Sequence, residues 1–406
     1  AQRNLPENYR LFRRLLHSRQ YDVVHLHIFH SLSLVYARLA RDAGVTVRIA
    51  HSHNTALRSS PLRPLKLLLH RAARALLTNC ATDLWACSGA AADFLFSAKA
   101  LRRRGFQWIP NGIHTELFRF DAGGRAAARR ELGLSDELLV GNIGRLCAQK
   151  NQAFLLDAFA ALLAGRPESR LLLVGEGEAE EALRRKAEQL GCGDKVIFYG
   201  VSSHVERLLW AMDVFAFPSR FEGLGIAAVE AQAAGLPVLA SEHVPPEAGV
   251  TPLLQALPLD AGAAGWAQAL QALCRPSGRR EDWAAAVRRG GFDVADAAAR
   301  IQAYYGRSLS EERSEDFNYF PQRPGGALPP QVPGQHRRPD LPPSGDYPDR
   351  RRLPRRLRGH LRRLRRPGRA HPGHPPAQPG RLRRAKRRAG RRHRGVDRLG
   401  GRGRLD

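Results

Sequence analysis

The chain has 406 residues, of which 43% are hydrophobic, and a formal net charge of +27 at pH 7. This length allows two domains with cores of ordinary size, and no apolar run approaches the roughly 18 residues that a membrane-spanning helix needs. The charge suggests a nucleic-acid-binding protein, but residues 307–406 alone hold 28 basic and 9 acidic residues, which leaves only +8 for the first 306.

Five cysteines are scattered along the chain, and they form neither a CxxC pair nor a cluster with the spacing of a zinc site. Such an odd set is typical of buried thiols in a reducing compartment, so we expect a cytoplasmic protein. The chain starts at Ala1 without a recognisable signal peptide, and its single methionine is Met212. These features suggest that the start is a cut edge.

Short apolar runs alternate with amphipathic patterns in the first part of the chain. The predicted strands are 23–29, 45–53 and 84–88, and the predicted helices are 31–44, 61–77 and a segment that ends near Ala98. QWIPNG at 107–112 ends this unit. Three strands make a thin sheet, and nothing before Tyr21 supplies an opening strand with a glycine loop. We therefore expect an incomplete first domain over residues 1–120.

A second series follows the polar link DAGG at 121–124. Its predicted strands are 137–145, 170–177, 195–200, 214–219 and 237–241, and helices at 278–290 and 293–305 are expected to close a domain over residues 121–306. Apolar strands separated by helices indicate parallel sheets that are covered on both faces. The predicted fold class is therefore α/β, with two doubly wound domains facing a cleft and ligands at the carboxyl ends of the strands.

The segment FEGLGIAAVE at 221–230 places two carboxylates around a glycine-rich helix start. Free backbone amides at the N-terminus of a helix bind phosphate, and Glu230 lies one turn into the predicted helix, where it can accept hydrogen bonds from a ribose diol. Glu222 can touch a sugar hydroxyl or pair with a basic residue. The alternative is a surface loop with solvated glutamates.

Two further segments follow predicted strands. In GNIGRLCAQKNQ at 141–152, Arg145 and Lys150 are spaced to flank a diphosphate, although two exposed basic residues in a loop are the alternative. In LVGEGEAEE at 173–181, the GxG lacks the third glycine of a dinucleotide fingerprint, which favours a simple tight turn.

Residues 137–247 resemble the nucleotide-binding domain of the retaining glycosyltransferases of family 4, which have the GT-B fold of two Rossmann-like domains. The matching segments are WIPNGIHTELF, GRLCAQKN, LLLVGEGE, VIFYG and MDVFAFPSRFEGLGIAAVEAQAAGLPVLAS. The E-x7-E pair with its glycines is the most specific of them. The resemblance covers about residues 20–305, and HSHN at 51–54 resembles the branch assigned to capsular or exopolysaccharide assembly.

This resemblance implies a metal-independent enzyme that needs no cofactor and transfers a sugar, with retention, from a nucleoside-diphosphate donor to a growing glycan or a lipid-linked acceptor. UDP is the commonest nucleotide in the family. Arg145 and Lys150 would bind the diphosphate and stabilise the leaving group. The other implied contacts are Gly223, Leu224, Gly225 and Ile226 to the distal phosphate, Glu230 to the ribose, Glu222 to the donor sugar, backbone near Tyr199, Gly200 and Val201 to the base, and His53 or His51 over the donor sugar.

The basic outer face of the helix at 61–77 suggests peripheral contact with an acidic membrane at its inner face, with solvated charge as the alternative. Binding of nucleic acid is not expected of the first 306 residues.

Residues 307–406 are rich in arginine, proline and glycine and poor in large hydrophobic residues, which predicts disorder. A polyanion-binding tail is one interpretation, although no aromatic residue follows Tyr347 to stack on bases. Another is a frameshift product, because shifting the codons of residues 346–366 by one base permits IILIDDGSPDGSGAICDAYAA, which resembles family 2 glycosyltransferases. The alternatives to an active enzyme are thus a polyanion-binding protein that acts through this tail and an inactive GT-B fragment.

Overall fold

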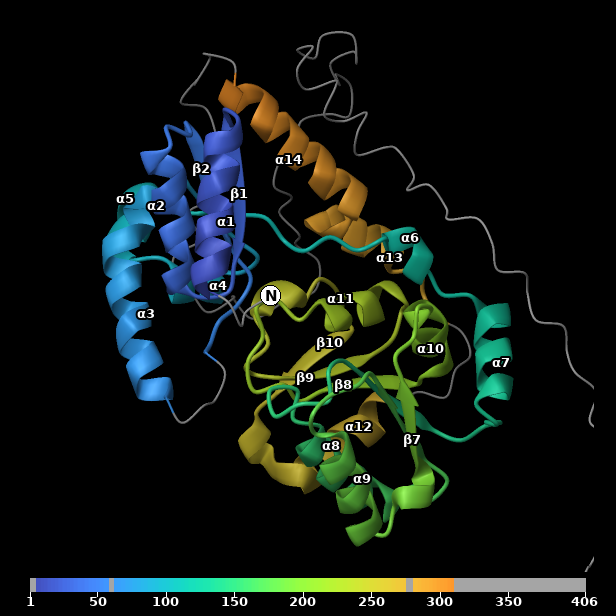
Figure 1. Cartoon of the computed structure of the whole chain (residues 1–406). Helices are drawn as coiled ribbons and strands as arrows, with labels where there is room; N and C mark the ends of the chain where they lie inside the picture. Colours follow the sequence, from blue (N-terminus) through green and yellow to red (C-terminus); the bar gives the residue numbers. More distant parts are fainter. Residues whose placement is uncertain (1–4, 58–61, 275–279, 310–406) are drawn as a thin grey trace, which may run out of the picture. The chain divides into compact units, whose positions relative to one another are not determined.

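The structure is a computed structural model that describes residues 5–57, 62–274 and 280–309, so the predictions made for the tail lie almost entirely outside the described residues. The described chain forms two parallel β-sheets with helices against them (Figure 1). The first sheet has the order β1-β2-β3-β4, and all three pairings are parallel. Its strands are β1 (Val23–Ile28), β2 (Val47–Ser52), β3 (Asp83–Ala86) and β4 (Gln107–Trp108).

Five α-helices accompany the first sheet in sequence: α1 (Leu5–Ser18), α2 (Val35–Asp42), α3 (Arg63–Leu77), α4 (Gly89–Leu95) and α5 (Ala98–Arg104). The helix predicted up to about residue 98 corresponds to α4, which ends at Leu95, and a second helix, α5, begins at Ala98. Ser88 caps α4 by accepting a hydrogen bond from Ala91 N, and Ser97 caps α5 by accepting one from Ala100 N. Each serine satisfies an amide at a helix start that would otherwise lack a partner.

The second sheet is also parallel throughout, in the order β10-β9-β8-β5-β6-β7. Its strands are β5 (Leu139–Ile143), β6 (Arg170–Val174), β7 (Val196–Gly200), β8 (Val214–Phe217), β9 (Val238–Ser241) and β10 (Leu254–Leu257). The chain leaves β5 in one direction to form β6 and β7, and then returns to the other side of β5 to form β8. The strand order therefore reverses between β5 and β8, which is where doubly wound sheets bind ligands.

The helices that follow are α6 (Thr115–Phe118), α7 (Ala122–Glu131), α8 (Gln152–Leu163), α9 (Glu180–Gln189), α10 (Val205–Ala211), α11 (Ile226–Ala233), α12 (Gly262–Leu273), α13 (Ala284–Val287) and α14 (Val294–Leu309), with a π-helical turn at Arg288–Phe292. DAGG, expected to be a link, is the start of α7. Asp121 caps this helix by accepting hydrogen bonds from Gly123 N and Gly124 N. The cap offsets the low helix propensity of two glycines.

The last described helix, α14, packs on the first sheet, which differs from the expectation that it closes the second domain (Figure 1). Ile301, Tyr304 and Tyr305 pack against a core that includes Trp85 of β3. The hydroxyl of Tyr305 lies 2.6 Å from Nδ1 of His25 on β1. The chain thus returns to the first sheet after completing the second.

Both sheets have apolar cores, and all five cysteines are buried free thiols, as predicted: Cys80, Cys87, Cys147, Cys192 and Cys274. Across the described ranges, each helix is too short or too polar to cross a membrane.

Candidate active site

The central interaction of the candidate site joins the two loops at the point where the second sheet reverses its strand order. Nζ of Lys150, on the loop after β5, lies 2.7 Å from Oε1 of Glu222, on the loop after β8. The Glu222 side chain is only 7% exposed. A carboxylate removed from water in this way needs its cation, so the pair holds the two loops together. The predicted pairing of Glu222 with a basic residue is thus observed for Lys150.

Backbone contacts fix the same two loops. Gln149 donates from Nε2 to the carbonyl of Phe221, at 3.0 Å, and its own carbonyl accepts from Arg220 N, at 2.8 Å. The ring of Phe217, at the end of β8, lies under the ammonium of Lys150, with 4.8 Å between the nitrogen and the ring centroid. This cation–π contact orients Lys150 toward the carboxylates.

Helix α11 begins at Ile226, where the sequence predicted it. Gly225 precedes it with φ = +93°, a backbone conformation that favours glycine, and turns the chain into the helix. Gly235, with φ = +66°, follows the end of the helix, and Gly235 N donates to Gln232 O. Gly225 thus sets the backbone turn at the start of α11, and only the segment from Gly223 to Gly225 separates Glu222 from the first helical residue, Ile226.

Glu230 lies one turn into α11 and is largely buried. Burial raises the pKa of its carboxyl to about 7, and the nearby charge of Lys150 partly offsets that rise. Lys150 therefore acts electrostatically on Glu230 as well as on Glu222. The structure brings together Lys150, both glutamates of the E-x7-E pair and the glycine turn.

The glycine turn also contacts the first sheet. A Cβ placed on Gly223 would lie 2.1 Å from the carbonyl oxygen of His53, so only glycine allows the two backbones to lie this close. Ser88 Oγ donates to Gly223 O at 2.5 Å, and Thr55 Oγ1 donates to Glu222 O at 2.8 Å. Neither Ser88 nor Thr55 was predicted as a site residue; the available signal was a polar side chain at the end of a predicted strand for Ser88 and just after one for Thr55.

His51 and His53 differ in their surroundings. His51 is buried and its Nε2 lies 3.1 Å from the carbonyl of Ile109, whereas His53 is partly exposed. Burial lowers the pKa of His51 to about 2 and that of His53 to about 4, so both are neutral near pH 7. Of the two candidates, His53 is the one whose backbone contacts the glycine turn.

Two histidines that the sequence analysis did not consider complete a four-histidine cluster of His25, His27, His51 and His53. His27 Nδ1 lies 2.8 Å from His53 Nε2, and His25 Nε2 lies 3.2 Å from His51 Nδ1. The signal was present in the sequence as HLH at 25–27 and HSH at 51–53. Alternate residues of a strand share a face, and the register pairs His27 with His51.

Arg145 lies at the surface, where its guanidinium pairs with Glu178 at 2.9 Å, and its side chain is 57% exposed. Arg145 lies in the loop after β5, as predicted, but the carboxylate that it contacts, that of Glu178, lies after β6. The GxG segment at 175–177 lies close to the backbone of the Arg145 loop. A Cβ on Gly175 would lie 2.3 Å from Gly144 O, and one on Gly177 would lie 2.1 Å from Leu146 O. Its glycines thus support the Arg145 loop, whereas the turn that was expected at the GxG lies just after it, at residues 178–179.

The segment predicted to meet the base ends β7. Gly200 has φ = +80°, and the side chains of Tyr199 and Val201 are exposed. They line a pocket of about 220 Å³ together with Ser202, His204 and other residues of the β7–α10 connection and of α7 and α10. Whether a base occupies this pocket stays a prediction.

Comparisons with known proteins agree with this architecture. Residues 124–289 match the family model "Glycosyl transferases group 1", and residues 1–117 match the model "Glycosyltransferase Family 4". The chain is similar to the putative glycosyltransferase EpsF of Bacillus subtilis, with 35% identity over 227 residues, or 55% of this chain and 58% of the relative. It also matches an Escherichia coli UDP-Gal:α-D-GlcNAc-diphosphoundecaprenol α-1,3-galactosyltransferase, with 28% identity over 56% of this chain and 59% of the relative.

Among solved structures, Anabaena HepE in complex with UDP and glucose superimposes with a TM-score of 0.59 and 22% identity, covering 74% of this chain and 82% of that one. The Thermosynechococcus elongatus sucrose-phosphate synthase gives a TM-score of 0.58 and 24% identity over 74% of this chain and 77% of its own. These likenesses show a two-sheet α/β fold of the GT-B class.

The chain belongs to the family 4 glycosyltransferases of the GT-B fold. It spans less than two thirds of the length of the two curated relatives named above.

Proposed function

We propose that the protein transfers a sugar, with retention, from a nucleoside-diphosphate donor to a glycan or lipid-linked acceptor during capsular or exopolysaccharide synthesis. The observation that carries the proposal is the convergence of Lys150, Glu222 and Glu230 at the start of α11, between β5 and β8. A cation beside exposed helix amides binds phosphate, and a carboxylate one turn away accepts hydrogen bonds from a ribose.

In this proposal the leaving diphosphate is stabilised by Lys150, by Arg145 and by the amides from Gly223 to Ile226, without a cofactor or a metal ion. A diphosphate bound here would compete with Glu222 for the ammonium of Lys150. Once Lys150 turns to the phosphate, Glu222 is free to accept a hydrogen bond from the donor sugar. Arg145 would exchange its exposed pairing with Glu178 for the diphosphate.

His53 would face the donor sugar from the first sheet, because its backbone touches the glycine turn. A neutral imidazole, favoured by its lowered pKa, can accept or donate a hydrogen bond to a sugar hydroxyl. The acceptor then attacks from the face the leaving group vacates, with the diphosphate oxygen as base. UDP is the proposed nucleotide, supported by the HepE complexes, which contain UDP.

A lipid-linked acceptor is supported by the E. coli relative, whose name specifies a diphosphoundecaprenol-linked substrate. Helix α3 supports peripheral contact with an acidic membrane. It exposes Leu65 at 53%, Leu68 at 64% and Leu76 at 76%, next to basic side chains such as Arg63 and Arg71. An exposed leucine face with adjacent cations is the composition of interfacial helices.

The test is to incubate the full chain with UDP-, GDP- and dTDP-linked sugars and measure release of nucleoside diphosphate with and without polyprenol-diphosphate sugars. We expect release from a UDP-sugar that an acceptor accelerates, and a product whose anomeric configuration by NMR matches the donor. An inverted product would refute retention. Absence of release from every donor, despite UDP binding, would identify an inactive fragment.

A further inference from the structure

The four-histidine cluster lies on the first sheet, and three of its members, His25, His27 and His51, have no role in the proposed transfer reaction. Its members are two HxH pairs on neighbouring parallel strands, and register places all four on one face. The rings of His25 and His27 are stacked with 4.5 Å between centroids, and those of His51 and His53 lie 4.1 Å apart. One ligand nitrogen from each of His25, His27 and His51 lies within 4.8 Å of the others.

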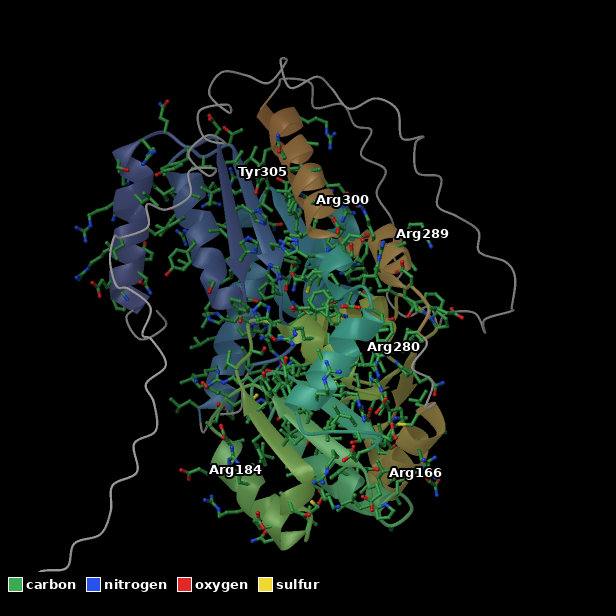
Figure 2. All side chains as sticks on the ribbon, turned by 90° about the vertical axis from the view of Figure 1, so that its right-hand side faces the viewer. Arg166, Arg184, Arg280, Arg289, Arg300 and Tyr305 are labelled. Carbon is green, nitrogen blue, oxygen red and sulfur yellow. The ribbon has the colours of Figure 1, made fainter. Side chains whose placement is uncertain are left out.

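The outer nitrogens of these rings already have partners. His25 Nδ1 lies 2.6 Å from the Tyr305 hydroxyl, and His51 Nε2 lies 3.1 Å from Ile109 O. Figure 2 shows Tyr305 on α14, the helix that packs on this sheet. Histidines that bind a metal usually donate their second N–H to a carbonyl, carboxylate or other acceptor. The contact of His51 with Ile109 O has this arrangement, and the Tyr305 hydroxyl can accept in the same way from His25 Nδ1–H.

A change in the tautomer of His25 would allow His25 and His51 to chelate a metal ion together. Without a metal, the Tyr305 hydroxyl donates to His25 Nδ1, His25 Nε2 donates to His51 Nδ1, and His51 Nε2 donates to Ile109 O. If His25 instead carries its proton on Nδ1 and donates to Tyr305, two bare nitrogens face each other at 3.2 Å. Two nitrogens at 2.0–2.1 Å from a tetrahedral Zn²⁺ are about 3.3 Å apart, so little movement is needed.

We propose that His25, His27 and His51 form a binding site for a divalent transition metal of the zinc class, with Tyr305 and Ile109 as supporting partners. Three neutral imidazoles suit zinc and leave a fourth position, which water can fill at the exposed His27 side. The site is separate from the diphosphate site and does not rest on the proposed function.

Binding is tested on the full chain without an affinity tag, because the histidines of such a tag would bind the metal themselves. Zn²⁺ is titrated calorimetrically, and Co²⁺ is titrated with visible absorption as a probe of tetrahedral coordination. We compare the wild type with His25→Ala/His51→Ala and with His204→Ala, whose histidine lies in the β7–α10 connection. The proposal predicts that the double variant loses one metal equivalent and the tetrahedral Co²⁺ bands, whereas His204→Ala keeps both.

Tyr305→Phe keeps the ring and the histidines but removes the acceptor for His25 Nδ1–H. We expect it to weaken Zn²⁺ binding by about 10-fold or more and to reduce the rise in melting temperature that Zn²⁺ produces in the wild type. If His25→Ala/His51→Ala does not fold, Tyr305→Phe and His27→Ala test whether the cluster binds a metal. Equal Zn²⁺ affinity and stoichiometry in the wild type, Tyr305→Phe and His27→Ala would overturn the proposal and leave the cluster as a hydrogen-bond chain.

Discussion

Lys150 is the residue on which the candidate site depends, because it interacts with both glutamates of the E-x7-E pair. Its ion pair with Glu222 is largely buried, and its charge partly offsets the raised pKa of Glu230. A buried pair adds little net stability compared with apolar residues, but loss of one partner leaves an uncompensated charge. The presence of this pair at a strand-order reversal is explained more easily by ligand binding than by stability.

The raised pKa of Glu230 predicts a pH dependence of stability. Its folded pKa, about 7, exceeds the ordinary value of 4.5, so the folded chain retains a proton that the unfolded chain has released. The free energy of unfolding therefore falls between pH 4.5 and pH 7 and levels off above, by up to about 3 kcal/mol from this group.

Glu230→Gln should remove this pH-dependent decrease in the free energy of unfolding. Urea unfolding at pH 5 and pH 8 measures it: the wild type should lose more stability than the variant over this interval. An identical loss in both proteins would show that Glu230 does not titrate as described.

At the residue scale, the sequence predicted the site where charged residues were combined with a glycine-rich helix start. Lys150, Glu222 and Glu230 were predicted as one site, and the structure brings them together. Arg145 pairs with Glu178 in the structure because an exposed guanidinium takes the nearest carboxylate, which spacing along the chain does not reveal. The clustering of His25 with His51 depends on strand register, which a single strand pattern does not specify.

At the element scale, the turn before α11 is the feature that requires a particular backbone. Gly225 has φ = +93°, and a Cβ there would lie 3.1 Å from the Phe217 ring and 3.2 Å from Val244. Alanine at this position costs about 1–2 kcal/mol through the left-handed conformation alone. Any relief of that strain moves the first amides of α11.

We expect Gly225→Ala to lower the free energy of unfolding by about 1–2 kcal/mol and to weaken UDP binding. Gly191→Ala is the matched control, because Gly191 also has positive φ, at +67°, and a Cβ there meets no described atom within 4 Å. Chemical unfolding and UDP titration of both variants separate strain from site geometry. UDP affinity that falls equally in both variants would contradict a specific role of the α11 turn.

Helices and strands were predicted well where the hydrophobic periodicity and the residue composition indicated the same kind of element, as for β1, β5 and α11. Two departures have physical causes. α7 starts within DAGG because the Asp121 cap outweighs two poor helix formers, and β10 was missed because Leu254–Leu257 carries no β-branched residue. The amphipathic pattern of α14 indicated a buried face but not which sheet would bury it; Tyr304 and Tyr305 pack on the first.

At the scale of the whole molecule, the proposed transfer uses only side chains and amides within the described ranges 5–57, 62–274 and 280–309. Deletion of residues 310–406 should therefore leave UDP affinity and melting temperature unchanged, which calorimetry and thermal unfolding check. Deletion from residue 294 onward also removes α14, and because Tyr304 and Tyr305 then leave Trp85 uncovered, we expect lower stability. A strong loss of UDP binding on removal of 310–406 alone would favour the polyanion-binding interpretation of the tail.

The most direct test of the account is a calorimetric UDP titration of the wild type, Lys150→Met/Glu222→Gln and the control Lys186→Met/Asp157→Asn. Both double variants neutralise an ion pair of the second domain, at 2.7 Å and 2.6 Å respectively, so neither leaves an unpaired charge. The account predicts that UDP binds the wild type and the control alike and binds Lys150→Met/Glu222→Gln at least tenfold more weakly, about 1.4 kcal/mol. Equal affinity in all three proteins would contradict the claim that Lys150 and the start of α11 bind the diphosphate.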